Sequence, residues 1–141
     1  MKKILNLIFF MLIFTDTLLA KNQSQYLKEG INLFEKKKFD EAKFKFEKDI
    51  VFNPKSELSY LYLSKIFKNL EKKNLEEQNL NTVILLNPKN EEAIFHLAKL
   101  KLKLSDYKKS KELNESLKTL CSKFCKESNK LKIEIENLSK K

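Results

Sequence analysis

The sequence repeats itself at a fixed interval, and this periodicity constrains the fold more than any other feature. The tripeptide Asn53-Pro54-Lys55 recurs as Asn87-Pro88-Lys89, with an offset of 34 residues between the two prolines. The same offset relates three small residues, which are Gly30, Ser64 and Ala98. A period of this length indicates a supersecondary unit that stacks on copies of itself and shares a core with them.

Each unit is predicted to be a pair of antiparallel helices. The chain has one Gly and two Pro, too few for the tight turns of a β-sandwich or for a Gly-rich phosphate loop. The small residue lets the paired helices approach closely, an aromatic residue begins the second helix at Phe39 or Tyr107, and the proline ends it. The predicted N-terminal capping residues are Ser56, Asn90, Asp40, Asp106 and, in a capping box with Glu77, Asn74.

This pattern resembles that of the tetratricopeptide repeat (TPR) family over about residues 23–122. The second unit departs from the family at Glu76, where a small residue is usual, and the third departs at Lys101, Asn114, Lys118 and Ser122. The matching residues of the first unit are Tyr26, Gly30, Leu33, Phe39, Ala42, Phe46, Ile50 and Pro54, and those of the second are Tyr60, Leu63, Ser64, Phe67, Leu80, Ile84 and Pro88. The resemblance implies an all-α fold of antiparallel helix pairs, stacked as a short right-handed superhelix of three repeats at about 23–56, 57–90 and 91–123.

The two ends of the chain carry further predictions. Residues 124–141 contain Leu131, Ile135 and Leu138 on one helical face, which favours a helix that caps the stack, with a dimerising or partner-binding helix as the alternative. Residues 1–20 have a basic start and an apolar run at 4–14, broken only by Asn6. This pattern predicts a cleaved export signal, and therefore a periplasmic or cell-envelope protein. An uncleaved membrane anchor or a buried helix are the alternatives.

Residues that carry chemistry are sparse. The single histidine, His96, cannot form a metal cluster alone, and no catalytic arrangement can be assembled, so neither an enzyme nor a cofactor is predicted. Cys121 and Cys125 are four residues apart, which would place them on one face of a helix. They are predicted to be packed thiols, a disulfide that an oxidising compartment would favour, or, least favoured, a redox or metal site.

The resemblance implies that the first helices of successive repeats line a concave groove. The residues at the corresponding positions are apolar along one line and lysine-rich along another; they are Leu27, Ile31, Phe34, Leu61, Tyr62, Lys65, Lys68, Phe95, Lys99, Leu102 and Lys103. Apolar anchors beside lysines are suited to an acidic or extended segment of a protein partner. Some family members hold a terminal carboxylate of chaperones with paired Lys and Asn, but here Leu27, Ile31, Leu61 and Lys65 occupy the corresponding places, which disfavours that activity.

The sequence thus predicts a non-enzymatic adaptor that binds another protein. The net charge of +10 also allows a binder of polyanions or of an anionic membrane surface, for example through Lys36-Lys37-Lys38. All basic residues are Lys and none is Arg. This argues against sequence-specific nucleic-acid recognition, because Arg is the residue that most often binds phosphate and guanine in a bidentate manner. A structural subunit of an envelope complex is a third class of function. Contact with a membrane is expected only if residues 1–20 are retained. The oligomeric state stays open.

Overall fold

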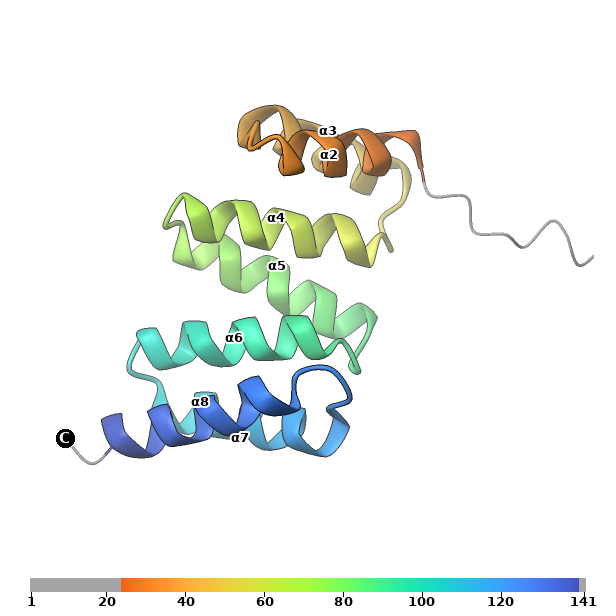
Figure 1. Cartoon of the computed structure of the whole chain (residues 1–141). Coiled ribbons are helices and arrows are strands. Elements are labelled where there is room, and N and C mark those ends of the chain that lie inside the picture. The colour runs from red at the N-terminus through yellow and green to blue at the C-terminus, as the bar shows by residue number, and fades with distance from the viewer. Residues whose placement is uncertain (1–23, 140–141) are drawn as a thin grey trace, which may run out of the picture.

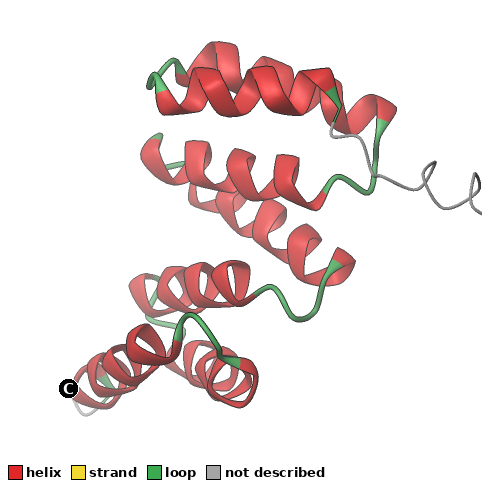
Figure 2. Ribbon diagram, turned by 45° about the vertical axis from the view of Figure 1, so that its right-hand side comes forward, coloured by secondary structure: helices red, strands yellow, loops and turns green. Residues whose placement is uncertain are grey.

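The structure, a computed structural model, describes residues 24–139, which form helices joined by short loops (Figure 1, Figure 2). Three pairs follow one another: α2 (Gln25–Glu35) with α3 (Phe39–Phe52), α4 (Glu57–Asn69) with α5 (Lys73–Leu86), and α6 (Glu91–Lys103) with α7 (Tyr107–Leu120). A last helix, α8 (Cys125–Leu138), follows them. Figure 1 shows α2, α4, α6 and α8 running in the same direction across the molecule. The predicted all-α architecture is confirmed, whereas the predicted export signal at 1–20 lies outside the described residues.

Close packing within the first pair depends on Gly30, as the repeat pattern predicts. A Cβ atom at this position would lie 2.6 Å from Cε1 of Phe46, a fully buried ring on α3. The equivalent residues Ser64 and Ala98 each carry a Cβ atom, and the residues 34 and 68 positions after Phe46 are Leu80 and Asn114. The first pair therefore combines the smallest residue on one helix with the largest on the other.

The turn inside each pair has one geometry and contains no glycine. Lys37, Glu71 and Ser105, spaced by 34 residues, have positive φ angles of 59°, 55° and 59°. In the first turn the backbone N–H of Lys38 donates to the carbonyl of Leu33, and that of Lys37 donates to the carbonyl of Phe34. These two bonds define a Schellman motif, which normally places Gly at the left-handed position. The other two turns repeat both bonds at the same offset.

The predicted helix caps are confirmed at two positions and wrong at two. Asn90 accepts a hydrogen bond from the N–H of Ala93, and Asp106 accepts one from the N–H of Lys109. The cap predictions for Asp40 and Asn74 are wrong, because the Schellman turns place the N-terminal caps of α3 and α5 two residues earlier, at Lys38 and Lys72. The predicted start of α3 at Phe39 is confirmed. Ser56 precedes α4, but its hydroxyl makes no capping bond and instead donates to Ser59.

A carboxylate at the first residue of α4 and of α6 ties each helix to the loop that ends the same repeat. Glu57 accepts hydrogen bonds from the side-chain amides of Asn87 and Asn90. Glu91, 34 residues later, accepts bonds of 2.8–2.9 Å from the backbone N–H groups of Ser122, Lys123 and Phe124. These donors hold the pKa of Glu91 down at about 2, with the Phe124 N–H contributing most. The third loop, which has no proline, is thus fixed by a side chain.

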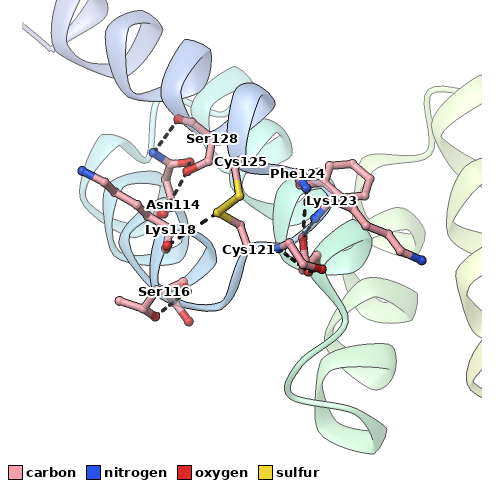
Figure 3. Close-up of a disulfide and its surroundings, with 11 residues drawn as sticks. Asn114, Ser116, Lys118, Cys121, Lys123, Phe124, Cys125 and Ser128 are labelled. Atoms are coloured by element: carbon pink, nitrogen blue, oxygen red, sulfur yellow. Dashed lines mark hydrogen bonds between the residues drawn. A yellow bond between two sulfur atoms is a disulfide. The ribbon is translucent and has the colours of Figure 1, made fainter.

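The two cysteines form a disulfide across this third loop (Figure 3). Their Cα atoms are 5.2 Å apart, a usual separation for bonded cysteines. The prediction that both lie on one face of a helix is wrong: α7 ends at Leu120, so Cys121 follows it, and Cys125 begins α8. Of the alternatives, the structure contains the disulfide. Next to it, Asn114 of α7 and Ser128 of α8 exchange buried hydrogen bonds of 3.0 Å.

Helix α8 starts 34 residues after α6 and occupies the place of the first helix of a further repeat. It buries Leu131 and Ile135 against Ala98 and Leu102 of α6, whereas Leu138, predicted on the same face, is partly exposed. In this way α8 covers the apolar end of the third pair. None of the helices α2–α8 is both long enough and apolar enough to cross a bilayer.

Candidate functional site

The predicted groove residues divide into three groups by burial. Leu27, Leu61 and Leu102 are buried between helices and serve as core residues. Lys68 and Lys103 are the most exposed of the set, although Lys68 keeps part of its side chain against the protein surface. The partly exposed side chains between these extremes are Ile31, Phe34, Tyr62, Lys65, Phe95 and Lys99. All of them project from α2, α4 and α6, so the surface that a ligand could reach consists of aromatic rings and lysines rather than the leucine column.

An aromatic cluster lies where α2, α3 and α4 meet. The Tyr62 ring stacks on Phe46 with centroids 5.1 Å apart and an interplanar angle of 11°. Phe34 meets the same tyrosine edge to face at 5.1 Å. Packing on both sides fixes the orientation of Tyr62, because buried neighbours leave its ring few rotamers. Tyr62 is therefore a partly exposed aromatic ring that is held in a fixed orientation.

Lys65 links this aromatic cluster to α6. Its ammonium lies 4.9 Å from the centroid of the Tyr62 ring and 2.7 Å from a carboxylate oxygen of Glu92. The same carboxylate lies 3.7 Å from Nε2 of His96. The His96 imidazole and the Lys65 ammonium together lower the pKa of Glu92 to about 2, which keeps this carboxylate ionised. Part of the charge of Lys65 is thereby neutralised within the protein.

The other groove lysines gather around a buried carboxylate. Partial burial lowers the pKa of Lys68, and the positive charges of Lys103, Lys99 and Lys65 act in the same direction, while Glu76 opposes them. Burial raises the pKa of Glu76, against the attraction of Lys68, Lys103 and His96. Four lysines from α4 and α6 thus lie near one another, with the Glu76 carboxylate beside Lys68 and Lys103 and the Glu92 carboxylate paired with Lys65. Lysines gathered in this way attract anionic groups.

The groove continues to the edge of α8. Phe95 lies 5.4 Å from the ring of Phe124 and has the Lys99 ammonium 5.8 Å from its centroid. Phe95 and Lys99 line one side of a pocket of about 210 Å³, and the residues of α8 that line the other side are Glu127, Lys130, Leu131 and Glu134. This end of the surface therefore has an aromatic ring together with positively and negatively charged side chains.

Two site residues could not be assigned from the repeat pattern alone. Glu92 lies in the first turn of α6, where an acidic residue is ordinary, yet it pairs with Lys65 of α4. Glu76 stands where the neighbouring repeats have Ala42 and Ser110, and that mismatch was the available signal for a carboxylate under the lysines. Among residues 24–139, no group of three or more His, Cys, Asp and Glu side chains has the arrangement of a metal site.

Solved structures of similar shape are helical repeat domains. The first TPR domain of Spaghetti (RPAP3), solved with an HSP90 peptide, has a TM-score of 0.72 and 19% identity, covering 81% of this chain and 90% of that one. The TPR2B domain of yeast Sti1, in a pHsp70 complex, has a TM-score of 0.74 and 16% identity, covering 82% and 99%. The Yersinia enterocolitica secretion chaperone SycD, with a peptide of the translocator YopD, has a TM-score of 0.73 and 16% identity, covering 86% and 100%.

The comparisons of sequence give no such similarity. No protein-family model and no curated protein matches the chain. At identities below 20% the solved structures are informative about the fold alone. The repeat period, the helix pairs and these structural neighbours agree with one another, and the chain has the fold of a tetratricopeptide repeat domain.

Proposed function

We propose that this protein is a non-enzymatic interaction module whose groove, formed by α2, α4, α6 and α8, binds an extended acidic segment of another protein. The observation that carries the proposal is a group of lysines on α4 and α6 that are at least partly exposed and close enough for three of them to lower the pKa of the fourth, Lys68; they are Lys65, Lys68, Lys99 and Lys103. Tyr62 and Phe95 border these lysines with ordered, partly exposed rings. Rigid aromatic side chains make effective interface anchors, and the lysines attract acidic partners.

Structural neighbours give this proposal its context. The RPAP3 domain and SycD were both solved with a bound peptide, and the Sti1 domain in a pHsp70 complex. Those ligands are properties of those proteins. What supports peptide binding by this chain is the fold together with its own aromatic and lysine side chains on the first helices of the repeats.

The proposal includes a location. The basic start and apolar run of residues 1–20 support export, so we place the adaptor in the bacterial cell envelope, in the periplasm or held at the inner membrane. N-terminal sequencing of native material tests this step. A mature protein that starts at Lys21 supports cleavage, whereas a membrane-bound protein that starts at Met1 supports the anchor. A cytosolic protein that starts at Met1 contradicts export.

A photocrosslinking experiment in cells tests groove binding. A photoreactive phenylalanine at position 95 is expected to form adducts with a discrete partner that mass spectrometry identifies. The double substitution Lys68→Glu and Lys103→Glu should reduce the adduct yield severalfold, because it reverses two exposed charges of the groove. The matched control is Lys108→Glu with Lys111→Glu, two exposed lysines of α7. Equal yields from the two double variants, or no discrete adduct, would contradict the proposal.

A further inference from the structure

The outer side of α3 exposes apolar side chains that no other described element covers. Phe44 is 53% exposed, and Val51 and Phe52 are each 73% exposed. These residues share one helical face, because positions separated by seven or eight residues lie above one another. The opposite face of the same helix buries Ala42 and Phe46 in the core. Helix α3 is thus apolar on two sides, and within residues 24–139 only one of them is buried.

Aromatic rings and lysines alternate on this outer face. Phe52 stacks on Tyr26 of α2, with centroids 5.7 Å apart and an interplanar angle of 13°. The Lys48 ammonium lies 4.6 Å from the centroid of the Phe44 ring and 5.6 Å from that of Tyr26. Lys45 lies 5.8 Å from the Tyr26 centroid. We name this surface the outer patch, and its members are Tyr26, Phe44, Lys45, Lys48, Val51 and Phe52.

Acidic side chains near the outer patch are engaged with neighbouring lysines. Glu29 of α2 lies 2.5 Å from the Lys45 ammonium, and Glu47 pairs with Lys43 at 3.1 Å. Within the described residues, Lys48 makes no ion pair within 4.0 Å. The patch therefore presents a positive charge among its exposed rings, and long lysine stems can cover the rings while the ammonium group points to water or to headgroups.

We propose that the outer patch docks on an anionic lipid surface. Aromatic rings are favoured at the headgroup level of a bilayer, and lysines are attracted to anionic lipids. The patch is also close in sequence to a segment that suits such a surface. The apolar run ends at residue 14, ten residues before Ser24, and Tyr26 lies in the first turn of α2. In a chain that retains residues 1–20, these ten residues span at most about 35 Å, a length that allows the run and the patch to meet the same surface.

Charge favours lipid over a second copy of the chain as the occupant. Two copies that met through their outer patches would bring Lys45 and Lys48 of each against those of the other, and each chain carries a net charge of +10. Like charges oppose such a contact, whereas they favour an anionic surface. The outer patch and the groove also share no residue, although Tyr26 of the patch and Ile31 of the groove both belong to α2. The inference is therefore independent of which protein the groove binds.

A tryptophan reporter provides the first test, since the chain has no Trp of its own. The full chain is mixed with vesicles of phosphatidylglycerol and phosphatidylcholine that carry brominated acyl chains. Phe52→Trp is expected to show a blue shift and at least twofold stronger quenching than Leu85→Trp. Leu85 is the matched control, because it lies 34 residues after Val51 and is 82% exposed. Equal quenching of the two reporters would overturn the proposal.

Removing the apolar contacts provides the second test, again in the full chain. Phe44→Ser with Phe52→Ser should weaken partitioning onto the anionic vesicles on the order of tenfold, since the transfer of apolar surface from water is lost. Leu75→Ser with Leu85→Ser, on α5, should leave partitioning unchanged. Circular dichroism is used to check that both double variants stay helical. Unchanged partitioning of the α3 variant, or a concentration-dependent dimer that this variant abolishes, would overturn lipid docking.

Discussion

At the scale of single residues, the turns within the helix pairs are the clearest departure from the usual sequence rules. Lys37, Glu71 and Ser105 each adopt a left-handed conformation that glycine reaches at no steric cost. The chain repeats this conformation at every pair without using the residue that suits it best. The conformation is therefore imposed by the helix packing around it, at some cost in stability for each turn.

Replacing Glu71 by Gly is expected to stabilise the fold by about 0.5–1 kcal/mol, because relief of the left-handed strain exceeds the added freedom of the unfolded chain. Chemical denaturation measures the change in the free energy of unfolding. Lys72→Gly serves as the control, since Lys72 has a φ of −84° and should lose stability. A loss of stability in both variants would contradict the strain argument.

Gly30 is a second residue whose substitution has a defined outcome. Gly30→Ala should destabilise the fold by about 1–3 kcal/mol, the usual cost of overpacking, because the new methyl group meets the Phe46 ring. The second repeat has Leu80 in the place of Phe46, so adding Phe46→Leu to Gly30→Ala should recover part of the loss. A double-mutant cycle on the free energy of unfolding measures the coupling, and strictly additive effects would show that the contact is unimportant.

At the scale of elements, the loop between α7 and α8 is held by Glu91 and the disulfide in place of a proline. Glu91→Gln should lower the melting temperature at pH 7, since the amide is a weaker acceptor for the three backbone donors. The pKa of Glu91 is about 2 in the folded protein against an ordinary 4.5. A lowered pKa means that its stabilisation is present above pH 4.5 and is lost as the pH falls from 4.5 toward 2.

The difference in melting temperature between wild type and Glu91→Gln should therefore shrink over that interval. Glu112→Gln, at an exposed carboxylate of α7, is the control and should change the melting temperature little at any pH. A difference for Glu91→Gln that stays constant from pH 7 to pH 2.5 would mean that its hydrogen bonds to the loop do not stabilise the folded state.

The sequence predicted the elements better than it predicted their junctions. The 34-residue period and the small residue at Gly30 determine the helix pairs, because both reflect packing that every repeat must satisfy. The aromatic residue correctly predicted the start of α3 at Phe39. The capping residues of α3 and α5 were misassigned to Asp40 and Asn74, because the Schellman turns lack Gly and these two were then the plausible caps. In the candidate site, the lysines follow from the offset, but the pairing of Glu92 with Lys65 depends on how neighbouring helices cross, which a single sequence does not specify.

At the scale of the whole molecule, α8 closes the end of the stack. Truncation after Phe124 should cause aggregation or loss of helicity, because Ala98 and Leu102 would lose the cover of Leu131 and Ile135. Sedimentation velocity and circular dichroism measure the two effects. Removal of residues 139–141 alone leaves α8 in place and should change neither. A soluble, fully helical protein that ends at Phe124 would show that the third pair needs no cap.

Helix α8 lies in the place of a fourth first helix, although the described residues contain three complete helix pairs. Four parallel helices make three intervals. The axes of directly packed helices lie about 9 Å apart, so the four helices extend across at least about 27 Å. An extended chain advances about 3.3 Å per residue. A strand laid from α2 to α8 would thus need at least about eight residues, a length that a linear epitope in a tail or linker supplies without unfolding its parent domain.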